Sequence, residues 1–218
     1  MSDFLNRMKS AAKADLKTIV LPEGEDPRTI VAATKIIEEG LAKIVILGNP
    51  DEIDVPGATV IDPRNAEKHE EYAQKFAELR AKKGVTIEQA RAQVRDATYF
   101  GTMMVKMGDA DGLVSGSVNS TANTVRPALQ VIKTKPGQKL VSGAFLMCFK
   151  DHVAVFSDCA INLNPDAEQL SEIALQSAET ARAFGIDPKV GMLSYSTLGS
   201  GKGPDVDMVE EATKLLKE

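Results

Sequence analysis

Residues 17–50 read KTIVLPEGEDPRTIVAATKIIEEGLAKIVILGNP, and this stretch decides the fold class. Two short runs of mainly β-branched residues, 17–21 and 43–47, flank a segment whose apolar residues recur at helical spacing. Asp26, followed by a proline, is typical of a helix start, and Gly40 is typical of a helix end. The pattern predicts a strand, a helix and a second strand. Because a helix joins the two strands, we expect them to lie parallel.

The alternation of strands and helices continues beyond this unit. A short strand is predicted at residues 58–61 and a polar helix at about 64–82. A capping box at Thr86 predicts a long helix that reaches Met107. A further strand at residues 112–116 then leads through a polar loop into a helix that starts near Thr124.

The alternating pattern of predicted strands and helices ends at a Lys-Pro-Gly sequence at residues 135–137. Two apolar runs, 140–149 and 152–158, predict an antiparallel pair. An amphipathic helix is expected from Asn164-Pro165-Asp166 to Gly185, then a strand at residues 189–195 and a helix from about Pro204.

These elements predict an α/β protein with two domains and a largely parallel sheet flanked by helices. The first domain is expected at residues 1–138, and residues 139–218 are expected to begin a second. The composition agrees with a globular chain, because 43% of the 218 residues are hydrophobic and 26% are charged.

Charge and cysteine usage exclude several classes of protein. The net charge is −5, and no basic run is interleaved with aromatic residues, which argues against nucleic-acid binding. No apolar run approaches the roughly 20 residues of a membrane helix, so no membrane association is expected. Two cysteines, Cys148 and Cys159, are too few for a disulfide framework, and we expect a cytoplasmic location.

The segment most indicative of chemistry is residues 115–127, SGSVNSTANTVRP, which joins a predicted strand to a helix. In α/β sheets, ligands bind beyond the carboxyl ends of the strands, where helix N-termini attract anions. Ser120, Thr121 and Thr124 can donate to phosphoryl oxygens, and Arg126 can form a bidentate pair with them. The alternative is an ordinary Ser/Thr helix cap with a surface arginine.

Other candidates are weaker on pattern alone. The glycine-rich loop at residues 194–203 is not a Walker A motif and is typical of a flexible connection. Arg80, near the end of a polar helix, is a candidate second cation for an anion site, although most helix arginines are solvated. Glu23, Glu25 and Asp26 form an acidic cluster, but capping explains Asp26 and the helix dipole explains the two glutamates. We therefore expect no metal site.

Several segments together resemble one family in their order and spacing: KTIVLPEGEDPRT, TYFGTMMVKMGDADGLVSG, STANTVRPALQVIKT, FSDCAINLNPD and MLSYSTLGSGKG. The chain resembles phosphate acetyltransferases, also called phosphotransacetylases. The resemblance implies reversible acetyl transfer between coenzyme A and inorganic phosphate, which yields acetyl phosphate. It also implies a two-domain fold like that of isocitrate and isopropylmalate dehydrogenases, a cleft between the domains as active site, and a homodimer.

Coenzyme A and acetyl-CoA are substrates in this family, with no metal and no tightly bound cofactor. The resemblance implies an active-site role for Arg126 and a role in coenzyme A binding for Arg80. The remaining positions that it places in the site are the phosphate-side loop and a segment that lines the cleft, namely Ser120, Thr121, Thr124, Ser196 and Thr197.

The chain departs from the family pattern in one respect. The family segment that resembles NDLSRG, with its catalytic serine, neighbouring arginine and following aspartate, has no counterpart in these 218 residues. In the family this segment also completes the first domain. The first domain, residues 1–138, is therefore expected to lack its C-terminal return segment, and the second, from residue 139, is expected to be truncated. The 218 residues alone are expected to show little turnover. Two alternatives stay open: a phosphate butyryltransferase, and a non-catalytic module that binds acyl-CoA.

Overall fold

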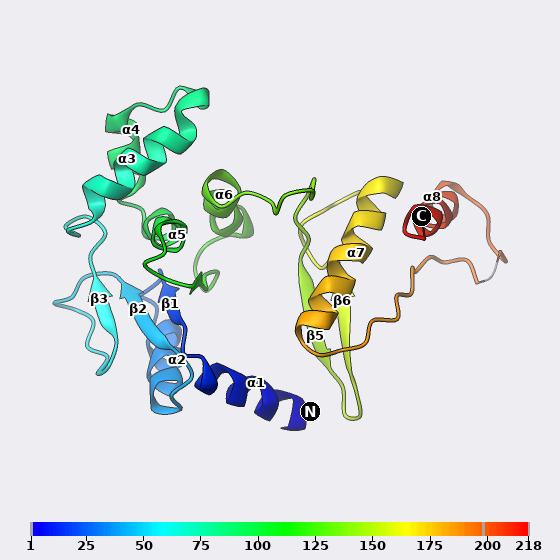
Figure 1. Cartoon of the computed structure of the whole chain (residues 1–218), viewed down its shortest axis with the longest axis horizontal. Helices are drawn as coiled ribbons and strands as arrows, with labels where there is room; N and C mark the ends of the chain where they lie inside the picture. The colour runs from blue at the N-terminus through cyan, green and yellow to red at the C-terminus, as the bar shows by residue number, and fades with distance from the viewer. Residues whose placement is uncertain (1, 198, 218) are drawn as a thin grey trace. The chain divides into compact units, whose positions relative to one another are not determined.

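The computed structural model describes residues 2–197 and 199–217, and the chain divides into two compact units (Figure 1). The first unit is Asn6–Lys133, and the second is Thr134–Glu218 together with Met1–Leu5.

A four-stranded parallel sheet forms the centre of the first unit. Its strands are β1 (Thr18–Leu21), β2 (Lys43–Leu47), β3 (Thr59–Ile61) and β4 (Gly112–Leu113), in the spatial order β3-β2-β1-β4. All three strand pairs are parallel, which confirms the prediction from residues 17–50. The strand predicted at 112–116 is shorter than expected, because only its first two residues pair with β1.

The helices of this unit pack against the sheet and against one another (Figure 1). They are α2 (Pro27–Glu38), α3 (His69–Arg80), a 3-10 turn (Ala81–Lys83), α4 (Ile87–Gln93), α5 (Ala97–Met107) and α6 (Thr121–Val131), and α1 (Ser2–Ala14) precedes the first strand. Val20 and Leu47 pack into one core with residues of α3 and α5. Leu21 and Ile46 pack into another core, with Ala33 of α2. The strands are buried on both faces, as is typical of parallel sheets.

The prediction of a single helix from Thr86 to Met107 is wrong, because the chain forms two helices there. The capping box at Thr86 and Gln89 is present, but the helix ends at Gln93, and Asp96, in an extended conformation, caps a second helix. The Asp96 carboxylate accepts hydrogen bonds from the amides of Thr98 and Tyr99, at 2.9 and 3.1 Å. These bonds replace the intrahelical ones that a continuous helix would make.

The second unit contains a two-stranded antiparallel sheet and two helices (Figure 1). The strands are β5 (Ala144–Cys148) and β6 (Val153–Ser157), and the helices are α7 (Ala167–Ala183) and α8 (Pro204–Leu215). The antiparallel pair and both helices confirm the prediction. The strand predicted at 189–195 is wrong: these residues form no ladder with the described strands, and β-propensity without a pairing partner does not make a strand.

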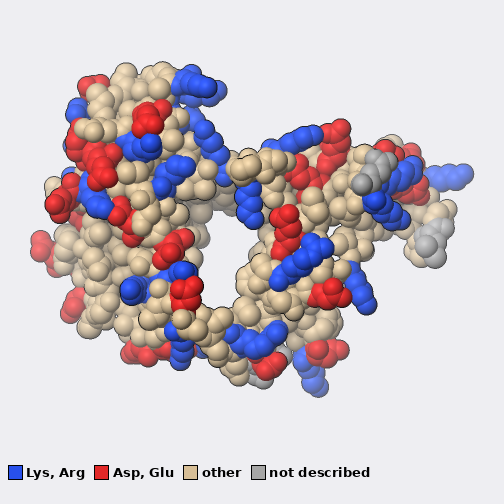
Figure 2. Space-filling model, in the orientation of Figure 1, with Lys and Arg blue, Asp and Glu red and all other residues tan. Residues whose placement is uncertain are grey.

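The surface drawn in Figure 2 carries Lys and Arg side chains interspersed with Asp and Glu. Within residues 2–197 and 199–217, no helix is both long enough and apolar enough to cross a lipid bilayer.

Candidate functional site

The strand order identifies where a ligand would bind in the first unit. From β1 the chain moves outward to β2 and β3, and it then returns to β4 on the other side of β1. The point between β1 and β4 is therefore a topological switch point, where α/β sheets form a crevice at the carboxyl ends of the strands. Two segments leave the sheet there: the turn with Glu23 after β1, and residues 114–119 after β4.

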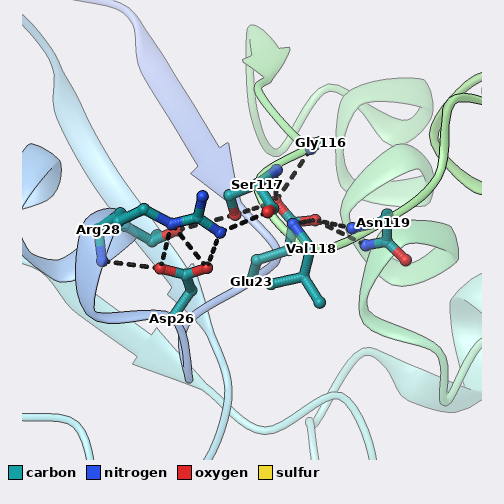
Figure 3. Close-up of polar contacts among 8 residues, drawn as sticks. Glu23, Asp26, Arg28, Gly116, Ser117, Val118 and Asn119 are labelled. Carbon is teal, nitrogen blue, oxygen red and sulfur yellow. Dashed lines mark hydrogen bonds and ion pairs between the residues drawn. The ribbon is translucent and has the colours of Figure 1, made fainter.

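The Glu23 carboxylate joins these two segments (Figure 3). Its Oε2 accepts from the backbone amides of Gly116 and Ser117, at 3.0 and 2.9 Å, and from the Ser117 hydroxyl at 2.6 Å. Its Oε1 accepts from the amides of Val118 and Asn119, at 3.0 and 2.7 Å, and from the Asn119 side chain at 2.9 Å. We call residues 116–119 the 116–119 loop.

This arrangement corrects the explanation of Glu23 as a residue placed by the helix dipole. Burial by itself would raise the pKa of Glu23, but hydrogen bonds from Ser117, Asn119 and Val118 outweigh that effect and hold the pKa far below its usual range. Glu23 is therefore ionised at neutral pH. It occupies the backbone amides that a bound anion would otherwise use.

Arg28 also stabilises this region, and it was not among the residues singled out from the sequence. Its guanidinium pairs with Asp26 and donates to the backbone oxygen of Ser117 (Figure 3). Asp26 also accepts from the Arg28 amide at 2.8 Å, which confirms it as the cap of α2. The side-chain hydrogen bond from Arg28 lowers the pKa of Asp26. Arg28 thus fastens the N-terminus of α2 to the 116–119 loop.

Helix α6 begins directly after this loop, at Thr121 rather than near Thr124 as predicted. The Ser120 hydroxyl accepts from the Asn123 amide at 3.3 Å, so Ser120 is the helix cap. Thr121 is exposed in the first turn. The amides of Thr121 and Ala122 have no acceptor within the helix, and together with the helix dipole they favour an anion there.

Two hydroxyls near the start of α6 are buried without a partner in the described part of the chain. They belong to Ser115 and Thr124. A Cβ built on Gly116 would lie 3.9 Å from the Thr124 Oγ1, so this hydroxyl lies beside the 116–119 loop. A buried polar atom without a partner costs free energy, and a ligand oxygen at this position would remove that cost.

Arg80 and Arg126 both influence Tyr99 electrostatically. Burial raises the pKa of Tyr99, and the positive charges of Arg126 and Arg80 both act to lower it. The Tyr99 hydroxyl donates to Gln130 of α6 at 3.1 Å. Arg126 is exposed, whereas the Nε of half-buried Arg80 is buried and has no partner among the described residues.

Ser196 and Thr197 belong to the second unit. The Ser196 hydroxyl accepts from the Gly201 amide at 3.0 Å, and the Thr197 amide donates to the Ser200 hydroxyl at 3.0 Å. Both hydrogen bonds lie within the glycine-rich loop at residues 194–203 and stabilise its conformation. Their proposed role in substrate binding stays a prediction.

A cavity of about 360 Å³ in the first unit contains none of the predicted site residues. Lys68, Tyr72 and Asp109 supply polar groups to its lining, and these groups already bind one another: Asp109 accepts from the Tyr72 hydroxyl at 2.6 Å and pairs with Lys68. No group of three potential metal ligands occurs within the residues that the structure describes.

Comparison with known proteins identifies the family of the chain. The family profile described as "Phosphate acetyl/butaryl transferase" matches residues 3–218. The chain belongs to this family. The family resemblance seen in the sequence is confirmed.

Curated members of the phosphate acetyl/butyryl transferase family are close in sequence to this chain. The phosphate acetyltransferase of Nitratidesulfovibrio vulgaris is 51% identical over 216 residues, which cover 95% of this chain and 31% of the relative. That of Acetivibrio thermocellus is 49% identical over 229 residues, which cover 99% of this chain and 69% of the relative. The chain therefore spans about a third of the first relative and about two thirds of the second.

Solved structures agree with the fold of this family member. The EutD phosphotransacetylase from Staphylococcus aureus matches with a TM-score of 0.90 and 45% identity, over 99% of this chain and 68% of that one. A phosphotransacetylase from Streptococcus pyogenes matches with a TM-score of 0.92 and 44% identity, over 100% and 69%. The α/β fold with its four-stranded parallel sheet is thus the fold of phosphotransacetylases.

Proposed function

We propose that this chain supplies the phosphate-binding part of a phosphate acetyltransferase. The reaction is acetyl-CoA plus inorganic phosphate giving acetyl phosphate plus coenzyme A, in both directions. Family membership supports the reaction class, and about 50% identity to phosphate acetyltransferases supports acetyl as the transferred group.

One observation carries the assignment of the site. Arg126 is exposed on a helix whose first-turn amides lack intrahelical acceptors, and Arg80 and the unpartnered Thr124 hydroxyl lie in the same unit. A phosphoryl group needs this combination of hydrogen-bond donors and positive charge. Because the net charge of the chain is −5, the attraction for an anion must be local.

In the proposed reaction the coenzyme A thiolate attacks the acetyl carbonyl of acetyl phosphate directly. The thioester C–S bond forms, the C–O bond to the phosphoryl group breaks, and inorganic phosphate leaves. Arg126 and the hydroxyls of Ser120, Thr121 and Thr124 hold the phosphoryl group, and Arg80 helps to hold coenzyme A. Neutralising the phosphoryl charge lowers the cost of bringing two anions together, and holding both reactants lowers the entropic barrier by up to roughly 7–11 kcal/mol.

Replacing Arg126 with alanine is expected to weaken the binding of acetyl phosphate by about 1.5–3 kcal/mol, because hydrogen bonds to charged groups contribute about that much. Titration calorimetry on the 218-residue chain measures this directly. Arg95→Ala serves as the control, because Arg95 is exposed and lies outside the proposed site.

Unchanged affinity in a folded Arg126→Ala chain would remove Arg126 from the site. Butyryl phosphate in the same titration tests the acyl preference, and tighter binding than acetyl phosphate would make the chain part of a butyryltransferase. Saturable acyl-CoA binding without any affinity for phosphate or acetyl phosphate would instead indicate a non-catalytic acyl-CoA module.

The finer features of the family extend the proposal. We expect the second unit, with Ser196 and Thr197, to belong to a second domain of the kind found in isocitrate and isopropylmalate dehydrogenases. We also expect a homodimer and a cytoplasmic location.

A further inference from the structure

The 116–119 loop depends on Glu23 for much of its order. Six hydrogen bonds run from this loop to one carboxylate that lies 93–96 residues earlier in the chain. Apolar packing contributes little, since the Val118 side chain is 70% exposed. Arg28 and Thr98 add contacts at the two ends of the loop, to the Ser117 oxygen and the Asn119 side chain.

The loop leads without interruption into the cap of α6. Asn119, which donates twice to Glu23, is followed by Ser120, the residue that caps the helix. Thr124 and Arg126 lie within the first two turns of that helix. The loop that Glu23 holds therefore helps to set the position of both residues relative to the sheet, together with the packing of Val131 in the core.

Glu23 also affects where an anion can bind. Four successive backbone amides that converge on one point form an anion site, of the kind that binds phosphate in many α/β proteins. In this chain a carboxylate already fills that site (Figure 3). The amides that stay available belong to the first turn of α6, at Thr121 and Ala122.

We propose that Glu23 is a positioning residue for the phosphate site: its carboxylate fixes the 116–119 loop and the start of α6, and it directs the phosphoryl group away from the loop amides to α6 and Arg126. This inference rests on the proposed function for the identity of the ligand. It assigns Glu23 no contact with substrate.

Three variants test it by amide hydrogen exchange, followed by NMR. Glu23→Ala removes the carboxylate. Glu23→Gln keeps the shape of the side chain but points an amide group at the donors of the loop. Glu25→Gln is the control, because Glu25 is a neighbouring glutamate that is exposed. In both Glu23 variants we expect exchange of the 116–119 amides to accelerate at least about tenfold, while the amides of β1 and β2 stay protected. The control is expected to match the parent chain.

Chemical rescue separates positioning from general loss of structure. Acetate has the atoms that Glu23→Ala removes, so millimolar to molar acetate is expected to restore protection of the 116–119 amides, and equal concentrations of chloride are not. Exchange that does not change in Glu23→Gln, or an acetate-insensitive Glu23→Ala chain that stays folded, would overturn the proposal. If Glu23→Ala does not fold, Glu23→Gln decides.

Titration with inorganic phosphate locates the ligand. In the parent chain, phosphate is expected to shift the amide resonances of Thr121, Ala122 and the Arg126 region, and to leave the 116–119 loop unchanged. Shifts centred on the loop would overturn the proposal. If phosphate shifts no amide resonance, the proposed function is wrong, and so is the proposed role of Glu23 in directing phosphate. The hydrogen-exchange and acetate-rescue experiments still decide whether Glu23 fixes the loop.

Discussion

Replacing Phe100 with alanine is expected to lower the free energy of unfolding of the first unit by about 3–5 kcal/mol. Phe100 lies on α5 and is only 1% exposed, with its ring centroid 5.0 Å from that of Tyr72. It packs in the core between the sheet and α3, so its removal leaves a cavity that surrounding side chains fill only in part. Urea unfolding followed by circular dichroism measures the change.

Phe156→Ala, in β6 of the second unit, is the comparison, because it removes the same side chain from a site that is 51% exposed, and its effect is measured on the unfolding of that unit. Its expected cost is about 1 kcal/mol or less, the range for a cross-strand pair. A loss below about 1 kcal/mol in Phe100→Ala would contradict the packing described for α5.

Asp158→Asn is expected to lower the stability of the second unit by about 3 kcal/mol, from the loss of charge-assisted hydrogen bonds. One oxygen of Asp158 accepts from the amides of Gly143, Ala160 and Ile161, at 3.2, 3.0 and 3.1 Å. The other accepts from the backbone and side-chain nitrogens of Asn162, at 2.5 and 2.6 Å. An asparagine would direct its own donors at some of these groups.

The pH dependence of stability provides a second measurement on Asp158. Burial acts to raise the pKa of Asp158, but hydrogen bonds from Ala160, Asn162 and Ile161 lower it to about 2. Because the folded pKa lies below the unfolded one, the stabilisation is complete above about pH 4 and is lost as the pH falls toward about 2. After allowance for solvent exposure, this loss is about 1–2 kcal/mol.

Urea unfolding of the second unit between pH 5 and pH 2 measures both effects. The Asp158→Asn chain is expected to be less stable at pH 5 and to show a smaller decline below pH 4. Asp151→Asn is the control, since the side chain of Asp151 in the same hairpin is 84% exposed. Equal pH profiles for the parent and Asp158→Asn chains would exclude this role for Asp158.

Local patterns were sufficient to predict most of the fold. The caps at Asp26, Thr86 and Asp166 are present as expected, because each depends on residues within three positions of the cap. Asp96 was missed because its surroundings are also compatible with a continuous helix. The strand predicted at 189–195 failed for another reason: strand formation depends on a neighbour that local propensity does not reveal.

Only part of the candidate site could be predicted from the sequence. The hydroxyl-rich entry to α6 and Arg126 could be singled out from residue type and order alone. The role of Glu23 could not, because its partners lie more than ninety positions away along the chain. The dipole of the next helix offered a sufficient local explanation for Glu23, and nothing within a few residues contradicted it.

Helix α6 also contains Pro127, which is buried inside the helix and has no N–H to offer the Asn123 carbonyl. The opening turns of α6 therefore lack one internal bond and depend on the loop before them. We expect this stretch to open and close independently of the sheet, on a faster timescale than global unfolding. Melting-temperature screens would then overlook variants that damage the proposed phosphate site, because such variants would change a local opening equilibrium and leave the global transition in place.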